Sequence, residues 1–245
     1  MKIIKLDYST IFILLILFLC GYIRIGLIIM FIVLFHELGH VLVCLFFKYK
    51  IINITIYPFG GITKIEKDIN TNSNKELILA FAGIFMQIIL IFIVKLFSIH
   101  DYELFLKYNY SIMLFNLIPI IPLDGSKIIN VFFCKIFPYK KALFLSFKLS
   151  VLFLILTIFY EFYYFNFLLF IWTILLILEN KKEKQFLLLK FYLFLKERME
   201  HQYQFPYCYE KINNVDRIKR DVHCIFQNQY TERDVIKRYF HYEIR

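Results

Sequence analysis

The feature that constrains this chain most is a cluster of ionisable residues inside an apolar run. The run from Leu27 to Phe47 is long and apolar enough to form one membrane-spanning helix, yet it contains His36, Glu37 and His40. Ionisable side chains inside hydrocarbon are costly unless they are paired or bind something. Two imidazoles and a carboxylate within five positions therefore predict a metal site built inside a membrane.

The composition agrees with a membrane location for most of the chain. Hydrophobic residues make up 60% of the 245 residues, with 30 Phe and only 7 Gly, and the mean hydropathy is +0.63. This is too apolar for one soluble domain of that length. The net charge of +10 could suit a nucleic-acid binder. In a membrane protein, however, basic residues gather in cytoplasmic loops and beside anionic headgroups, so we expect the lipid bilayer as a partner and no nucleic acid.

Apolar runs predict an all-α polytopic membrane protein with about six transmembrane helices, a small membrane-associated β-hairpin and a short cytoplasmic tail. The fifth and sixth runs are separated only by Glu161 and aromatic residues, so they form either a tight helical hairpin or one long helix, and we favour the hairpin. We expect residues 1–180 to form the membrane domain and residues 181–245 to form a tail with an amphipathic helix over Glu183 to His201. The six runs are Thr10 to Tyr22, Leu27 to Phe47, Leu77 to Phe97, Leu104 to Ile121, Leu145 to Tyr160 and Tyr164 to Leu178.

The distribution of basic residues predicts the orientation of these spans. If the N-terminus is cytoplasmic, eleven lysines lie on the cytoplasmic side and only Arg24, Lys95 and Lys107 lie on the other. An even number of spans then places the C-terminal tail in the cytoplasm as well. We expect a multi-pass protein with both termini cytoplasmic.

The spacing of the two histidines suits one metal ion. Residues at i and i+4 of an α-helix lie about 40° apart around the axis and about 6 Å along it, so His36 and His40 can both aim at one ion. Glu37 lies about 100° from His36 around the helix, which places it to act on water at the metal. A catalytic zinc normally has three protein ligands and one open position, so a third ligand is required.

Asp124 is the candidate for that ligand. The other four histidines lie in a short loop or in the tail, whereas Asp124 follows a stretch with Pro119 and Pro122. The prolines break the fourth span and Gly125 permits a turn, so we expect unwound backbone there with Asp124 pointing inward. Asn116, earlier in the same span, makes either an ordinary interhelical hydrogen bond or a contact to the substrate or its developing oxyanion.

Between the second and third spans, the pattern changes to that of a β-hairpin. Isoleucines alternate with polar residues over 52–57, residues 58–61 make a turn, and 62–66 form a return strand. The hairpin is either a sturdy loop or an exposed edge. An edge strand could hold a substrate that has been unwound from its helix, by strand addition. On that interpretation the substrate-binding residues are Asn116, Ile54, Ile56, Phe59, Gly60 and Gly61.

Taken together, these motifs resemble the site-2 protease family of intramembrane zinc metalloproteases. The resemblance rests on His-Glu-Leu-Gly-His, Pro-Phe-Gly-Gly, the Ala82-Gly83 pair and Asn-x-x-Pro-x-x-Pro-Leu-Asp-Gly, and it covers about residues 1–180. It implies a zinc metalloendopeptidase with one zinc ion held by His36, His40 and Asp124, and Glu37 as the catalytic carboxylate. The chain departs from the family in the third span, where Ile84 follows Gly83 and Gln87 takes the place of the distal amide residue.

Without an inserted domain, the chain is most similar to the branch of that family that acts at sporulation stage IV. The resemblance implies a bacterial cell membrane, a sigma-factor precursor or similar regulatory protein as the membrane-associated substrate, and inhibitory membrane partner proteins. That branch also carries a nucleotide-sensing domain after its last helix, and the tail from Lys181 to Arg245 is short for one. The tail either docks a partner or lies at the membrane surface.

A zinc transporter or metal-binding membrane scaffold is the alternative, because transporters also place histidine and glutamate in broken helices. The sequence shows no inverted repeat, and it has one metal constellation without a relay of further acidic residues along other helices. These features favour the protease. Measuring zinc uptake into proteoliposomes and proteolysis of a tethered peptide would separate the two functions.

Overall fold

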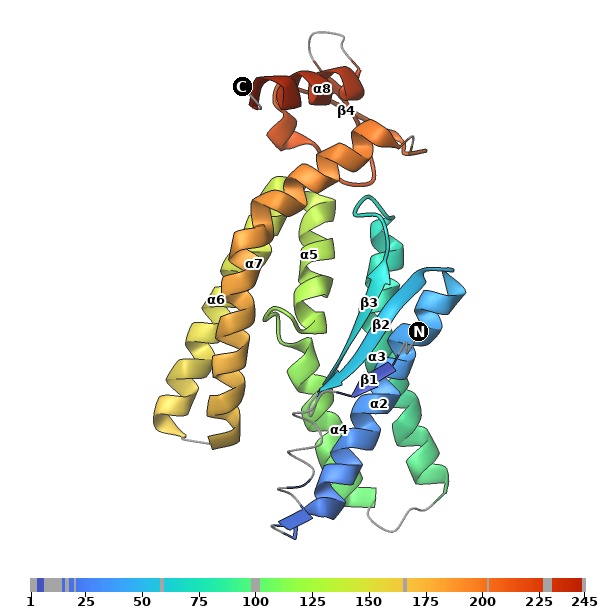
Figure 1. Cartoon of the computed structure of the whole chain (residues 1–245), viewed down its shortest axis with the longest axis vertical. Coiled ribbons are helices and arrows are strands. Elements are labelled where there is room, and N and C mark those ends of the chain that lie inside the picture. Colours follow the sequence, from blue (N-terminus) through green and yellow to red (C-terminus); the bar gives the residue numbers. More distant parts are fainter. Residues whose placement is uncertain are drawn as a thin grey trace. The chain divides into compact units, whose positions relative to one another are not determined.

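The computed structural model describes residues 4–6, 15, 18–19, 21–57, 60–97, 102–164, 167–201, 203–226 and 231–243. It is mostly helical, with two small sheets (Figure 1). The elements are β1 (Ile4–Leu6), α2 (Ile23–Phe46), β2 (Lys50–Tyr57), β3 (Gly60–Glu66), α3 (Ser73–Leu96), α4 (Tyr102–Leu117), α5 (Asp124–Ile136), α6 (Tyr139–Tyr163), α7 (Phe167–Glu200), β4 (Tyr207–Ile212), the 3-10 helix η1 (Val215–Arg217), β5 (His223–Phe226) and α8 (Glu232–Glu243).

The chain forms two compact units. The first contains Met1–Lys67 and Ile78–Leu117, and the second contains Asp68–Leu77 and Ile118–Arg245. The boundary predicted at residue 180 is of a different kind, because it divides a membrane domain from a tail by function. That boundary stays a prediction.

Three helices of the described chain are long and apolar enough to cross a membrane: α2, α3 and α6, with 24, 24 and 25 residues. They correspond to the second, third and fifth predicted spans. The fourth predicted span yields α4, which has 16 residues and is about 24 Å long, because a helix usually ends before the residue that precedes a proline. Most of the first predicted span, Thr10 to Tyr22, lies outside the described residues.

The break after α4 is confirmed, but its details differ from the prediction. Gly125 does not form a turn. Instead, Asp124 and Gly125 begin helix α5, which the sequence patterns did not predict. The negative charge of Asp124 in the first turn is favourable there, because the backbone N–H groups at a helix N-terminus carry partial positive charge.

Helices α6 and α7 form the predicted hairpin. Thr173 of α7 donates a hydrogen bond to Glu161 of α6, and Ser150 of α6 donates one to Asn180 of α7 at 2.7 Å. Most of the sixth predicted span and the amphipathic helix predicted at 183–201 lie in one continuous helix, α7, of 34 residues. Lysine, glutamate and leucine, which have high helix propensity, are frequent in this stretch, and it contains no proline or glycine. Nothing in the sequence therefore ends the helix there.

The first unit joins three helices and a sheet. Its apolar core contains Ile32 of α2, Leu90 and Val94 of α3, and Phe105 of α4. The sheet has the order β1-β2-β3, with β1 parallel to β2 and β2 antiparallel to β3. The parallel pairing of β1 was not predicted. It places the N-terminal strand beside the hairpin, and α2 packs against β2 and β3 (Figure 1).

The predicted β-hairpin is confirmed, with a shorter turn than expected. Gly60 and Gly61 are the first residues of β3, where they pair with Tyr57 and Ile56, instead of lying in the turn. Phe59 lies outside the described residues, as do the side chains of Ile54 and Ile56.

In the second unit, the C-terminal strands and helices pack on α6 and α7. Tyr139 of α6 stacks on Phe194 of α7 with ring centroids 4.2 Å apart, and Ile218 and Ile236 are fully buried in the same core. The described residues from 203 onward therefore form a small folded module in which β4 and β5 are parallel. Its core continues that of the helical hairpin.

A buried arginine is the hub of that module. The Arg198 side chain is 2% exposed and donates to Asn70 Oδ1 at 2.9 Å, to Glu232 Oε1 at 2.5 Å, and to the carbonyl oxygens of Lys219 and Val222. Three segments of the chain, at residue 70, residues 219–222 and residue 232, therefore converge on one guanidinium. A buried charge is tolerated when all its hydrogen bonds are made. Removing it leaves its partners buried without a hydrogen bond, which lowers the stability of the fold.

A neighbouring arginine ties the tail to the first turn of α3. Arg220 donates to Glu76 Oε2 at 2.5 Å and to the Thr71 carbonyl oxygen at 2.8 Å. Burial lowers the pKa of the Arg220 guanidinium, but the Glu76 carboxylate, together with Cys134 and Tyr139, outweighs this effect. The pKa therefore lies above its usual value and Arg220 stays charged. The backbone N–H of Ser73, at the start of α3, donates to Asp221.

We predict that Arg198→Ala destabilises the second unit by about 3–5 kcal/mol, because it leaves the Glu232 carboxylate and several carbonyl oxygens buried without their donor. Thermal unfolding of the detergent-solubilised protein measures the effect. Lys196→Ala is the matched control, since the exposed Lys196 only meets Glu200 at 3.7 Å. Equal unfolding temperatures for the two variants would contradict the role of Arg198.

Candidate metal centre

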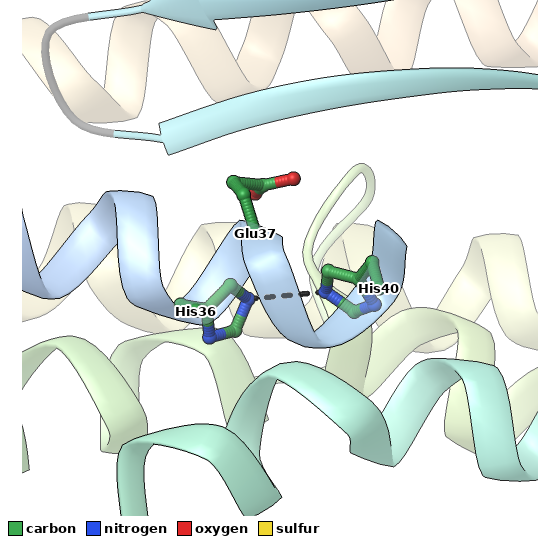
Figure 2. Close-up of side chains that lie close together, drawn as sticks. All are labelled: His36, Glu37 and His40. Carbon is green, nitrogen blue, oxygen red and sulfur yellow. Dashed lines mark hydrogen bonds between the residues drawn. The ribbon is translucent and has the colours of Figure 1, made fainter. Parts of the chain in front are cut away.

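Helix α2 presents two imidazoles on the side that faces α3 (Figure 2). His36 and His40 are 4% and 8% exposed, one helical turn apart. Their rings lie at 72° to each other with centroids 4.9 Å apart, and their Nε2 atoms are separated by 3.2 Å. The predicted pair therefore converges on one point.

The outer nitrogen of each ring has a partner on α3. His40 Nδ1 lies 2.9 Å from the carbonyl oxygen of Leu79, and His36 Nδ1 lies 3.0 Å from Oε1 of Gln87. A carbonyl oxygen only accepts, so Nδ1 of His40 carries a hydrogen. The amide nitrogen of Gln87 donates a hydrogen bond to Asn109 Oδ1 at 3.3 Å. This bond turns Oε1 of Gln87 towards His36, so Nδ1 of His36 carries the hydrogen as well.

These tautomers leave the lone pairs of both Nε2 atoms pointing at one place. Two such lone pairs 3.2 Å apart repel each other unless a cation is shared between them. Two imidazole nitrogens bound to a tetrahedral zinc at their usual distances would be about 3.3 Å apart. Histidine ligands also commonly donate their other N–H to a carbonyl or amide oxygen. The donor set and its geometry therefore fit a metal ion.

Close contact between α2 and α3 makes this arrangement possible. A methyl group built on Gly83 would lie 2.7 Å from His36 Nδ1 and closer still to two other ring atoms. One built on Gly39 would lie 2.6 Å from Cγ of Met86 and 2.8 Å from the carbonyl carbon of Ala82. Only glycine leaves the room that the His36 ring and the α3 backbone occupy. This accounts physically for the Ala82-Gly83 pair noted in the sequence.

Glu37 approaches from another direction. Its side chain is 8% exposed and points towards the strands, away from the side of α2 that carries the imidazoles (Figure 2). One carboxylate oxygen and one nitrogen from each of His36 and His40 nevertheless lie within 4.8 Å of one another. The carboxylate can therefore act beside the ion without belonging to the face that binds it.

The other two predicted polar residues are described within their own units. Asp124 is 4% exposed, and Lys127 donates to its Oδ1 at 2.7 Å. Asp124 belongs to the second unit, so its role as third ligand stays a prediction. Asn116 is half-buried and donates to the Ile112 carbonyl oxygen of its own helix at 3.1 Å, which differs from the interhelical bond considered as one alternative. Its contact with a substrate also stays a prediction.

Two residues of the site were not assigned a partner from the sequence. Gln87 and Asn109 are fully buried, and Asn109 Nδ2 also donates to the Gln87 carbonyl oxygen at 3.1 Å. Their signal was present, because an amide side chain inside an apolar helix needs a hydrogen-bonding partner. The sequence could not show that the partner of Gln87 is an imidazole 51 residues away.

Comparisons with known proteins agree with this geometry. Residues 24–103 match the model of peptidase family M50. The chain is 38% identical over 144 residues to Stage IV sporulation protein FB of Bacillus subtilis, covering 56% of this chain and 50% of that protein. It is 31% identical over 119 residues to Zinc metalloprotease MJ0392 of Methanocaldococcus jannaschii, covering 45% and 34%.

The fold has a counterpart among solved structures. The site-2 protease from Methanocaldococcus jannaschii superposes with a TM-score of 0.58 at 24% identity, covering 74% of this chain and 89% of that one. The chain spans half or less of the length of the two curated relatives above. Residues 24–103 thus match peptidase family M50, and the chain shares its fold with that site-2 protease.

Proposed function

We propose that this chain is an intramembrane zinc metalloprotease that hydrolyses a peptide bond in a membrane-associated protein. The observation that carries the proposal is the pair of imidazoles on a bilayer-length helix, with both Nδ1 atoms engaged by α3 and both Nε2 atoms converging. The match to peptidase family M50 over the same residues supports it.

In this proposal one zinc ion per chain is held by His36, His40 and Asp124. Zinc bound by such a set polarises a carbonyl group and lowers the pKa of a water molecule. The chain's own contribution is to fix the two imidazole tautomers in advance. Leu79 and Gln87 do so from α3, so the two imidazoles require no rearrangement to bind.

Glu37 is the proposed proton carrier. It follows His36 in sequence and lies on another side of the helix, yet its carboxylate stays within 4.8 Å of the imidazole nitrogens. At that distance the carboxylate can accept a proton from the attacking water and return it to the leaving amine. Its burial removes competing bulk water and strengthens its interaction with the reacting groups. This division of roles explains why the three ionisable side chains do not share one face.

The sheet supplies a surface for the substrate. Among the described strands, β2 lies between β1 and β3, so β3 is an edge strand that can accept an added strand from an unwound substrate. We propose that such a segment runs along β3, with Gly60 and Gly61 permitting close backbone approach. Ile54, Ile56 and Phe59 of the hairpin, together with Asn116, complete the proposed substrate contacts.

The biological setting follows from the Bacillus relative, whose name places it in sporulation. We propose that the substrate is a sigma-factor precursor or a similar regulatory protein, and that membrane partner proteins hold the enzyme inactive. The proposed location is a bacterial cell membrane, crossed several times, with both termini in the cytoplasm. The lysine distribution supports this orientation.

We predict that Glu37→Gln lowers the cleavage rate of a co-expressed membrane substrate by about 10²–10⁴-fold, because the amide cannot carry the proton. The purified variant keeps its zinc, measured by elemental analysis. Glu103→Gln, exposed on α4, is the control and cleaves normally. Full activity of Glu37→Gln would refute the assignment, and metal uptake into proteoliposomes without proteolysis would favour a transporter.

We predict that Gly83→Ala weakens metal retention by about 10–100-fold, because the added methyl group displaces the His36 ring. Zinc content after dialysis against a chelator measures the loss. Phe85→Ala, which changes an exposed side chain on the same helix, keeps its zinc. Wild-type retention by Gly83→Ala would show that the α2–α3 contact does not position the ligand.

We predict a similar loss of retention for Gln87→Leu, which removes the acceptor of His36 Nδ1 without adding bulk next to the ring. The absorption spectrum of the cobalt-substituted protein reports the altered coordination directly. A spectrum identical to that of the wild type would contradict the proposed role of Gln87.

A further inference from the structure

The segment between α4 and α5 is held by a polar network that the mechanism above does not use. Residues 118–123 are not helical, and Ile121 lies between Pro119 and Pro122. The backbone N–H of Ile121 donates to Ser150 Oγ at 2.9 Å, and its carbonyl oxygen accepts from Asn180 Nδ2 at 2.9 Å. Both backbone polar groups of this residue are therefore satisfied by side chains of other helices.

The two side chains complete each other. Ser150 of α6 is fully buried and Asn180 of α7 is 4% exposed. Ser150 Oγ donates to Asn180 Oδ1 at 2.7 Å, and the second amide hydrogen of Asn180 goes to the Leu176 carbonyl oxygen at 3.0 Å. The hydroxyl thus donates and accepts, and the amide uses both its hydrogens and its oxygen. A buried network with every group satisfied is rigid and specifies one arrangement.

The rest of the segment carries that rigidity to Asp124. The Leu123 N–H donates to the Ile120 carbonyl oxygen at 2.8 Å, and Ser126 Oγ donates to the Leu123 carbonyl oxygen at 2.7 Å. Ile120 is fully buried. Only two residues separate Ile121 from Asp124. Hydrogen bonds hold the backbone at Ile121 and again at Leu123, next to Asp124.

We propose that Ser150 and Asn180 are positioning residues that hold the Pro119–Pro122 segment so that Asp124 is presented as a metal ligand. The proposal rests on the function proposed above, because it takes Asp124 as the third ligand. It assigns the α6–α7 hairpin a part in the metal centre. Unwound backbone inside a membrane must find its hydrogen bonds within the protein, and here those bonds also set the place of the carboxylate.

The test measures metal retention in Ser150→Ala and Asn180→Leu, using the full-length protein in detergent. We expect zinc to be lost to a chelator about 10–100-fold faster than from the wild type, as for the loss of other groups that orient a ligand. The spectrum of the cobalt-substituted protein should change as well. Ser150→Thr keeps the hydroxyl and should restore both properties.

Thr173→Val is the matched control for stability. It removes another buried hydrogen bond between the same two helices, the one to Glu161 near the far end of the hairpin. We expect it to lower the unfolding temperature while metal retention stays at the wild-type value. Equal metal loss from Thr173→Val and Asn180→Leu would mean that the network only stabilises the hairpin, and would overturn the proposal.

Asp124→Ala separates this inference from the function on which it rests. If Asp124→Ala keeps its zinc, the third ligand is misassigned and the proposed metal centre itself fails. If Asp124→Ala loses zinc while Ser150→Ala and Asn180→Leu keep it, the metal centre stands and only the positioning role is overturned. Loss of zinc from all three variants, with retention in Thr173→Val, supports both.

Discussion

The close packing of α2 on α3 at Gly39 and Gly83 is the contact on which the candidate centre depends. It lets Leu79 and Gln87 reach the outer nitrogens of the two imidazoles, and those bonds decide which nitrogen of each ring faces the ion. Inside a bilayer no water can replace these partners, so the protein has to supply them. The tautomers are therefore a property of helix packing, and the two imidazoles are oriented without a metal ion.

Amide side chains solve the same problem at two places in the molecule. Gln87 and Asn109 satisfy each other while one of them orients His36, and Asn180 satisfies Ser150 while holding Ile121. An amide suits this task because it donates and accepts at once and carries no charge that hydrocarbon would penalise. The His36 ring and the backbone of Ile121 are thus both held by uncharged side chains.

Local patterns in the sequence predicted the parts of this fold that depend on neighbours in the chain. The His36 and His40 spacing, the alternation before Pro58 and the break near Pro119 each follow from one short stretch. The parallel pairing of β1 with β2 and the contact between Gln87 and His36 could not be predicted, because they join segments that are distant in sequence. Helix α5 was missed because Gly125 was taken as a turn residue, although it is accommodated in the first turn of the helix.

The bond from Asn180 to Ile121 also has a consequence for biosynthesis. The two residues are 59 positions apart, so Ile121 leaves the ribosome well before its partner is made. On the proposed arrangement, a nascent chain carries His36 and His40 in the membrane while the segment before Asp124 still lacks its hydrogen bond from Asn180. Metal loading and proteolytic competence would then come late, once α7 has been inserted, so chains truncated before Asn180 would lack proteolytic activity.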